Sequence, residues 1–327
     1  MVTLENGWVP SRSSDRRLTE SNITNGLAMN EAFDGSTSVF SYLDIPPLRS
    51  SRIHLRPVRP GDYPFLYELA VKPEDGFRWR FRGSQPSFEQ FVQGLRSEIH
   101  CMYLVERIQP CEPIGHVSCY KAEFKNRNAF VAIQGRGELC GSGLLMEAME
   151  LFVDFLFKTW EFEKLYAECP AFNMGMFRSG AGRVFEIEGI LRGHERILGR
   201  SWDLYVLAIF RKTWEQWRAN GEMARADLLV ELGRDESGAG VAFEEFATFL
   251  STRIPGLDRF EVLEPEMELV GDAGLDSIGV IELFDLLEGL TGILGDSQIK
   301  DCSTLGDVYF LYLQGSPLSA AGKSLNR

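Results

Sequence analysis

The sequence has no long apolar run and no secretion signal. Its 327 residues hold no uninterrupted apolar stretch near the ~20 residues that a bilayer-spanning helix needs. The N-terminus has no basic segment followed by an apolar one, and the four histidines are scattered without metal-ligand spacing. We therefore expect a cytoplasmic protein with no membrane partner and no metal site.

Paired cysteines are also absent. None of the six cysteines belongs to a Cys-x-x-Cys pair, and most lie within apolar segments. This spacing is typical of buried free thiols in a reducing compartment. The six are Cys101, Cys111, Cys119, Cys140, Cys169 and Cys302.

Basic residues are scarce in one part of the chain. Between residues 226 and 315, 19 Asp and Glu stand against four Arg and Lys, a net charge of −15. The whole chain carries −13, so the remainder carries +2. An acidic module repels nucleic acid and attracts basic patches on other proteins. Together with the length, this charge pattern predicts two domains, one of them acidic, and no nucleic-acid partner.

The acidic part centres on Gly274-Leu275-Asp276-Ser277-Ile278, which precedes an amphipathic helix. Asp276 and Ser277 are both good helix caps, and capping alone would explain them. Their surroundings favour more than a cap, because an amphipathic helix from Val241 to Ile254 comes before and a helical piece around Val308 comes after. The pattern predicts a small four-helix bundle with Ser277 exposed to solvent at the start of its helix.

This part resembles the acyl carrier proteins, in which the serine of a Gly-x-Asp-Ser-Leu/Ile pattern bears 4′-phosphopantetheine. The resemblance implies that Ser277 is the attachment site and that a phosphopantetheinyl transferase modifies it. It also implies that Asp276, Glu282 and Asp285 are recognised by acyl-loading or downstream biosynthetic enzymes that dock on the acidic carrier. The expected boundaries are a linker at 218–240, a carrier domain at 241–315 and a tail at 316–327.

The rest of the chain reads as an α/β domain after a polar, flexible leader at 1–50. A strand from Ile53 to Val58 leads into a helix, and three strands of an antiparallel meander follow between Met102 and Gln134. The turn Gly141-Ser142-Gly143 then opens a strongly amphipathic helix. Such a turn exposes backbone N–H groups and the positive end of the helix dipole, both of which bind phosphate. A strand from Lys164 to Cys169 and a helix opening at Asn173 come next.

This order of elements resembles the GCN5-related N-acetyltransferase (GNAT) superfamily over about residues 52–217. The patterns that carry the resemblance are Gly-x-Gly-x-x-x-Glu-Ala at Gly141 to Ala148, Asn173, Glu188-Gly189-x-Leu-Arg and Asp203. The resemblance implies, for a domain at 51–217, an α/β fold with a mixed, mostly antiparallel, splayed sheet and helices on both faces.

In that superfamily the pantetheine arm of the acyl donor lies between two splayed strands, here Asn128 to Gln134 and Lys164 to Cys169. The resemblance therefore implies that Gly141, Ser142, Gly143 and Asn173 bind acyl-CoA, coenzyme A or a pantetheine arm.

Two positions depart from the superfamily's phosphate-binding pattern, Arg/Gln-x-x-Gly-x-Gly/Ala. Cys140 and Leu145 stand at its first and last positions, and Leu145 brings a side chain to a point where the backbone usually approaches a pyrophosphate. A carrier-borne arm has a single phosphodiester and no pyrophosphate, so the altered turn suits it. Family drift with a weaker coenzyme A site explains the departures equally well.

Acyl transfer to an amine needs a base for the ammonium proton and a donor for the leaving thiolate. Relatives often use a Tyr or Ser after the second splayed strand as the donor. That position is Met176 here, and Ser179 is the nearest hydroxyl. His116 is a candidate base, although a lone histidine on a strand is more often structural. Further candidates are Tyr205, Glu147, Glu168 and Asp203.

The combined reading is an acyltransferase that works with its own phosphopantetheinylated carrier in polyketide- or nonribosomal-peptide-type natural product biosynthesis. It moves an acyl group between a thioester, either acyl-carrier or acyl-CoA, and a small amine. Two alternatives remain open. The first is a GNAT-like loading domain that charges the carrier thiol from acyl-CoA, with or without decarboxylation. The second is a domain without chemistry that only docks the carrier.

Overall fold

The computed structural model describes residues 48–72, 84–95, 97, 99–139, 142–197, 199–231, 240–291 and 302–314. Most of the expected leader, the expected tail, and Cys140 with Gly141 lie outside these residues. All described residues belong to one compact unit, Ile45–Arg327. No helix among them is long and apolar enough to cross a membrane.

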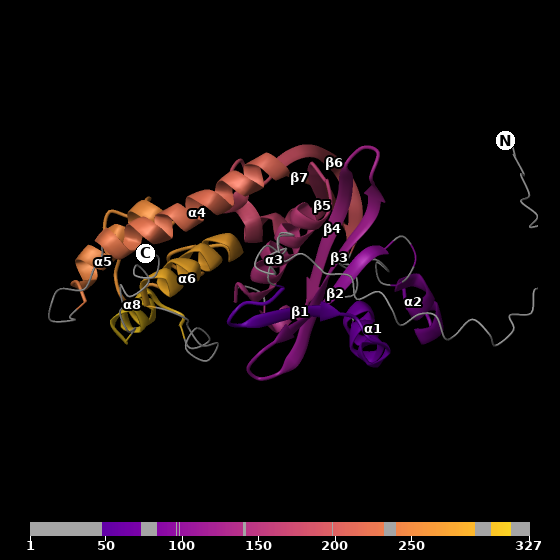
Figure 1. The fold of residues 1–327 in the computed structure, drawn as a ribbon, viewed down its shortest axis with the longest axis horizontal. Coiled ribbons are helices and arrows are strands. Elements are labelled where there is room, and N and C mark those ends of the chain that lie inside the picture. Colours follow the sequence, from indigo (N-terminus) through magenta and orange to yellow (C-terminus); the bar gives the residue numbers. More distant parts are fainter. Residues whose placement is uncertain are drawn as a thin grey trace, which may run out of the picture. The chain divides into compact units, whose positions relative to one another are not determined.

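The described residues form a seven-stranded mixed sheet with the order β1-β2-β3-β4-β5-β7-β6 (Figure 1). Adjacent strands are antiparallel except for the β4–β5 pair. The predicted meander is β2, β3 and β4. The bounds are β1 Ile53–Pro57, β2 Ile99–Arg107, β3 Glu112–Glu123, β4 Asn128–Gly135, β5 Lys164–Pro170, β6 Glu186–Ile197 and β7 Arg200–Phe210.

The parallel pair β4–β5 separates along its length. The two strands are paired only where Asn128–Phe130 lies beside Lys164–Tyr166. Beyond Tyr166, β5 continues to pair with β7 but no longer with β4. The sheet is therefore splayed at its centre, as the resemblance implied.

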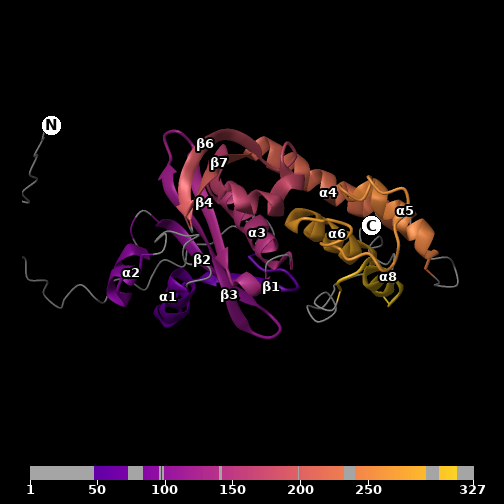
Figure 2. The ribbon, with the colours of Figure 1, turned by 180° about the vertical axis from the view of Figure 1, so that it is seen from behind.

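Helices cover both faces of this sheet (Figures 1 and 2). On one face lies α3 (Leu144–Thr159), whose apolar stripe buries Ala148, Phe152 and Leu156 completely. On the other face, α1 (Tyr63–Val71) and α2 (Phe88–Leu95) share a separate apolar cluster. Short 3₁₀ helices η3 (Pro60–Asp62) and η5 (Gly137–Leu139) connect elements. The predicted helix at Asn173 is a 3₁₀ helix, η6 (Ala171–Gly180).

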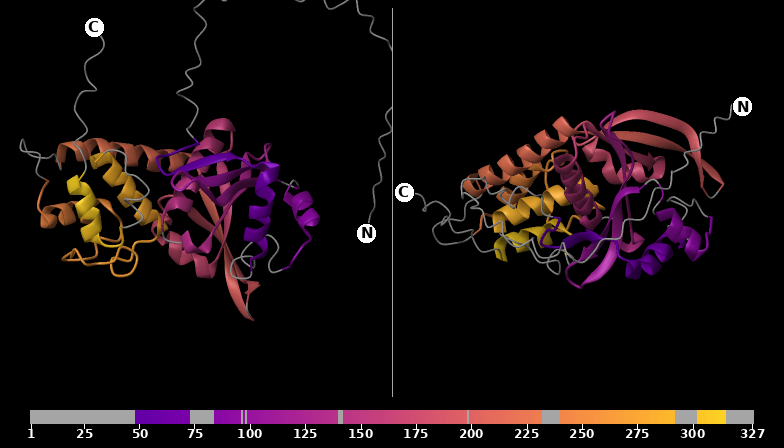
Figure 3. Two further views of the ribbon diagram at one scale, coloured as in Figure 1. Left: turned by 90° about the horizontal axis from the view of Figure 1, so that it is seen from below. Right: turned by 45° about the vertical axis from the view of Figure 1, so that its right-hand side comes forward.

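Much of the predicted linker at 218–240 is helical. The helix α4 runs without a break from Arg211 to Glu231, because its first turns are anchored on α3. The indole Nε1 of Trp214 donates to Asp154 at 2.5 Å, and Arg218 forms an ion pair with Glu150. Further along, α4 lies beside the C-terminal helix α6 (Figures 1 and 3). The segment 232–239, which the sequence predicts to be flexible, lies outside the described residues.

The C-terminal part contains three α-helices among its described residues: α5 (Phe243–Arg253), α6 (Ser277–Thr291) and α8 (Leu305–Gln314). They enclose an apolar core of their own, in which Phe246, Leu283 and Val308 are fully buried. These helices match the three that the sequence predicts. A fourth helix is not present among the described residues.

Candidate active site

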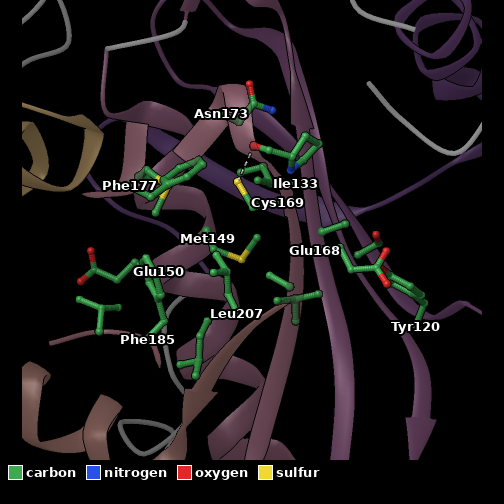
Figure 4. Close-up of a pocket in the computed structure, with 18 of the residues that line it drawn as sticks. Tyr120, Ile133, Met149, Glu150, Glu168, Cys169, Asn173, Phe177, Phe185 and Leu207 are labelled. Atoms are coloured by element: carbon green, nitrogen blue, oxygen red, sulfur yellow. Dashed lines mark hydrogen bonds between the residues drawn. The ribbon is translucent and has the colours of Figure 1, made fainter. Parts of the chain in front are cut away.

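A cavity of about 480 Å³ lies where β4 and β5 separate (Figure 4). Its walls come from β2 to β7, α3, η6 and α4, and from the first turns of α6. Side chains lining the gap itself include Val131, Ala132, Ile133, Ala167, Glu168 and Cys169. The splay implied by the resemblance therefore opens a cavity in the sheet, and is not merely a break in the hydrogen-bond ladder.

The cavity reaches both sides of the sheet. Met149 and Glu150 of α3 line it on one side of the strands, whereas Tyr120 and Glu168 lie on the other (Figure 4). Two molecules can therefore meet in the gap after entering from opposite faces, which is the arrangement that transfer of a group between two substrates requires.

Cys169 is the one sulfhydryl among the side chains lining the cavity. Its thiol is buried, and burial raises its pKa to about 12. The Sγ atom donates to the carbonyl oxygen of Pro170 at 3.6 Å. A thiol with this pKa stays protonated at neutral pH and is not a nucleophile, because the thiolate is the reactive form.

The described part of the chain contains no group of three or more His, Cys, Asp and Glu side chains that could hold a metal ion. Its five described cysteines, Cys101, Cys111, Cys119, Cys169 and Cys302, are free thiols.

A family comparison covers the residues that form one part of this cavity. Residues 52–179 match the family model described as an acetyltransferase (GNAT) domain. These residues are a GNAT-type acetyltransferase domain, so the chain is an acyltransferase. The seven-stranded mixed sheet, which continues beyond them into β6 and β7, is GNAT-like.

Solved structures similar to this chain include a spermidine N-acetyltransferase and a spermidine/spermine N-acetyltransferase, both from Vibrio cholerae. The structure with coenzyme A and spermine is 22% identical, covers 51% of this chain and 99% of its own, and has a TM-score of 0.46. The structure with manganese ions is 22% identical, covers 51% of this chain and 96% of its own, and has a TM-score of 0.44. Overlap at this level says nothing about the substrate of this chain. No curated protein matches the sequence.

Helix α6 packs against the GNAT domain through its first turn. The carboxylate of Asp276 accepts from the backbone N–H of Ser179 at 2.6 Å and from the Ser179 hydroxyl at 2.7 Å. The same carboxylate accepts from the N–H groups of Ile278 at 3.2 Å and Gly279 at 3.0 Å. Asp276 thus caps α6, as its sequence context predicts, and also joins α6 to η6.

A second polar contact lies one turn further along α6. Glu282 forms an ion pair with Arg183, and the indole Nε1 of Trp217 donates to the same carboxylate at 3.1 Å. Burial raises the pKa of Glu282, and the positive charge of Arg183 opposes that rise. The contact links α6 to the segment after η6 and to α4.

The third contact lies at the start of β1. Arg52 and Glu147 form a buried ion pair at 2.5 Å, and the Arg52 guanidinium lies 5.7 Å from the centre of the Phe284 ring of α6. Burial raises the pKa of Glu147, Arg52 lowers it, and the carboxylates of Asp285 and Glu288 raise it again. The Ser51 hydroxyl also donates to Glu288 at 2.8 Å.

Apolar side chains of α6 fill the space between these polar contacts. Ile278 is buried within the core of the GNAT domain, and a Cβ on Gly180 would overlap its Cδ1 atom. Val280 and Ile281 lie against Gly143, 3.4 and 3.3 Å from the position of a Cβ on that residue. Gly143 has a φ of +77°, and it precedes the first turn of α3. Helix α6 therefore covers the turn that the sequence predicts to bind phosphate.

This packing corrects the expectation that Ser277 is exposed to solvent. Ser277 is 6% exposed, because the first turn of α6 packs against η6 and α3. Asp276 and Glu282 lie in the same contact, so in this arrangement neither carboxylate is free to meet another enzyme. Asp285 is half-buried near Glu147. The local capping signal was read correctly, but the tertiary contact that covers the serine has no signature in the sequence.

The structure separates the remaining candidate residues into two groups. Asn173 and Glu168 line the cavity. Ser142 is not among the lining residues and donates its hydroxyl to the carbonyl of Leu139 at 2.7 Å, while Gly141 lies outside the described residues. Glu147 and Asp203 both make structural contacts. Glu147 pairs with Arg52, and Asp203 accepts from the backbone N–H of Gly193 at 2.8 Å.

His116, Ser179 and Tyr205 do not line the cavity. His116 is buried beside Gln134, whose Nε2 donates to the carbonyl of Leu69 in α1 at 3.1 Å. Burial lowers the pKa of His116 to about 4, against a smaller opposing effect of Gln134. Ser179 is bound to Asp276, and Tyr205 is paired with Cys169 in the sheet.

Sequence reasoning missed Tyr120, Met149 and Phe177, all of which line the cavity. Tyr120 lies on β3 beside the splayed strand, two residues from Ser118, which also lines the cavity. Residues two apart in a β-strand point to the same face of the sheet, so this spacing is the signal that could have identified Tyr120.

Proposed function

We propose that the chain is an acyltransferase that acts on a thioester carried by its own C-terminal helices. In this proposal Ser277 bears 4′-phosphopantetheine, residues 241–315 are an acyl carrier domain, and the acyl group passes to a small amine in natural product biosynthesis of the polyketide or nonribosomal-peptide type. The observation that carries the proposal is the position of Ile278. It follows Ser277 directly and forms part of the cavity wall.

The contacts of α6 support delivery of an arm from Ser277. The start of α6 is fixed by the hydrogen bond between Ser179 and Asp276. Further along, Glu282 pairs with Arg183 and accepts a hydrogen bond from Trp217. An arm attached at this point begins beside the cavity, so it has little distance to cross before it reaches the gap between β4 and β5. Such tethering raises the effective concentration of the thioester at the site into the millimolar range.

The covered turn at Gly143 favours a carrier-borne arm over free coenzyme A. Backbone N–H groups at the start of a helix bind phosphate when a ligand can approach them. Here Val280 and Ile281 lie against Gly143, so a coenzyme pyrophosphate and α6 would compete for the same place. An arm on Ser277 has a single phosphodiester that is attached to α6 itself, so it does not compete with α6 for the space at Gly143.

The chemistry is aminolysis of a thioester. The amine nitrogen attacks the thioester carbonyl, the C–N bond forms and the C–S bond breaks, and the pantetheine sulfur leaves as a thiolate that takes up a proton. A base removes the proton that the amine loses. We assign this role to Glu168, because among the carboxylates expected from the sequence it is the one that lines the cavity, on the face opposite Met149 and Glu150 (Figure 4).

Intact mass of the full chain tests the carrier assignment. Treatment with a phosphopantetheinyl transferase and coenzyme A should add one phosphopantetheine, and Ser277→Ala should remove the gain. Ser251→Ala, on α5, is the matched control and should be modified like the natural chain. No gain of mass in the natural chain would contradict the assignment.

Acyl transfer is then followed on the loaded chain. With acyl-CoA in place of coenzyme A, the same transferase loads an acyl-arm, and a panel of primary amines should release the acyl group as an amide. If the unloaded chain with free acyl-CoA forms amide equally fast, the carrier is not the donor. If an unacylated arm on Ser277 gains an acyl group from free acyl-CoA, the loading alternative replaces this proposal.

A further inference from the structure

We propose that the acyl group on the thioester is a hydrocarbon chain longer than acetyl, and that it lies in an apolar lobe of the cavity. The lobe is defined by Met149, Val184, Phe185, Leu207, Ile209 and Trp214. The inference rests on the proposed function, since it takes the thioester to reach the cavity from Ser277.

The lobe is part of the core and not a groove on the surface. Each of its six side chains is at most 9% exposed, and all six belong to the main apolar core of the GNAT domain. One wall is fixed in position, because the Trp214 indole donates to Asp154 of α3 at 2.5 Å. Its floor is Leu207 and Ile209 of β7, which is paired along its length with β5.

Open space among such side chains has a physical cost. Protein cores are close-packed, and a void lined by apolar groups loses both transfer free energy and dispersion contacts. Apolar voids of this kind also stay dry, because water finds no hydrogen-bond partners there. A hydrocarbon chain would fill the lobe and recover those contacts, whereas an acetyl group, which has a single methyl group, would recover fewer of them.

Charges near the lobe select against an acyl group that ends in a carboxylate. Glu150 lines the cavity, and Arg218 pairs with both Glu150 and Asp154. Two carboxylates already share this one guanidinium. A third carboxylate that entered the lobe on an acyl chain would meet the like charge of Glu150, which is unfavourable. The lobe therefore fits a neutral hydrocarbon chain and disfavours a dicarboxylic acyl group.

Binding of free acyl-pantetheines to the full, unmodified chain tests this inference. Calorimetric titration would use acetyl-, butyryl- and hexanoyl-pantetheine as probes. Burial of each methylene should strengthen binding by about fourfold, so hexanoyl-pantetheine, which has four more methylenes, should bind roughly 250-fold more tightly than acetyl-pantetheine. Succinyl-pantetheine should bind no more tightly than acetyl-pantetheine. Equal affinity for all chain lengths would overturn the inference.

Two substitutions in the lobe test its location in opposite directions. Val184→Phe fills the lobe and should flatten the dependence on chain length, while Met149→Ala enlarges it and should move the preference toward chains longer than hexanoyl. The control is Ile187→Phe on β6, where the natural side chain is 43% exposed. This variant should show the same dependence of binding affinity on acyl chain length as the natural chain. The Val184→Phe chain should melt at the same temperature as the control. If it does and still prefers hexanoyl-pantetheine as strongly as the natural chain, the hydrocarbon chain lies elsewhere.

The binding experiment and the loading experiment fail independently. A chain that takes no phosphopantetheine on Ser277 but binds hexanoyl-pantetheine tightly loses the carrier assignment and keeps the lobe. A chain that is loaded normally but binds all acyl-pantetheines equally keeps the carrier and loses the lobe.

Discussion

Asp276 accepts two hydrogen bonds from Ser179, a residue 97 positions earlier in the chain, through the backbone N–H at 2.6 Å and the hydroxyl at 2.7 Å. The same carboxylate caps α6 through Ile278 and Gly279. One side chain therefore sets both where α6 begins and where it packs. Because Ser277 is the next residue, any loosening of this contact changes access to the serine.

The contact makes a prediction about the rate of modification of Ser277. Ser179→Ala removes the hydroxyl donor from Asp276 and leaves the carrier motif intact. A hydrogen bond to a charged group is worth about 1.5–3 kcal/mol, so contact between α6 and the GNAT domain should weaken by at least ~10-fold. Phosphopantetheinylation, followed by intact mass over time, should become faster. The exposed Ser201→Ala on β7 should leave the rate unchanged, and a slower Ser179→Ala chain would contradict the prediction.

A second prediction concerns pH. Burial raises the pKa values of Glu282 and Glu147 in the contact with α6, so the packed state binds more protons than the released state as these groups titrate. Contact of α6 should therefore strengthen as pH falls from neutral toward the raised pKa values, and gain nothing more below the ordinary glutamate range. Hydrogen exchange of residues 277–291 between pH 8 and 5 measures this effect.

Substitutions distinguish the titration of the buried carboxyl groups from other effects of pH on the chain. Glu282→Gln keeps the shape of the side chain and removes its titration, so the pH dependence of exchange in α6 should become smaller. Glu266→Gln, at an exposed position in the loop between α5 and α6, should keep the natural dependence. Increasing protection of α6 with rising pH would show that the sign is wrong.

A third prediction compares two glycines of the same 3₁₀ helix. A Cβ on Gly180 would overlap Cδ1 of Ile278 and lie 2.9 Å from Cε1 of Phe185, whereas a Cβ on Gly175 would meet no atom within 4 Å. Overpacking of this kind costs about 1–3 kcal/mol. Gly180→Ala should therefore increase hydrogen exchange in α6, and Gly175→Ala should not. Equal hydrogen exchange in the two variants would mean that the packing of Ile278 does not require the absence of a side chain at Gly180.

A fourth prediction addresses the proposed base. Glu168→Gln removes a carboxylate from the cavity and should lower single-turnover amide formation from a loaded chain by about 10²- to 10⁴-fold, the usual range for a general base. Loading of Ser277 should be unaffected, because Glu168 lies away from α6. Glu161→Gln, outside the cavity, is the matched control. A Glu168→Gln chain with natural activity would remove Glu168 from the mechanism.

Much of the fold was predictable because its signals are local. The period of 3.6 in α3 and α6 and the alternation in β2, β3 and β4 come from which side chains face a core, and the cap at Asp276 needs only neighbouring backbone N–H groups. The Gly143 turn was visible in its glycines, and the splay of β4 and β5 was implied by the resemblance to the GNAT superfamily. The face of β3 on which His116 lies was not predictable, since a slip of one residue in register exchanges the two faces of a strand.

The sequence by itself determined the element order, the acidic C-terminal part and the helix that starts at Ser277, since each depends on residues close together in the chain. Only the tertiary structure decided that Ser277 is buried, that α4 continues into the expected linker as far as Glu231, and that α6 covers the turn at Gly143. Those outcomes depend on contacts such as Asp276 with Ser179 and Ile278 with Gly180. Residues so far apart have no periodic pattern in common, and they meet only when both cores have formed.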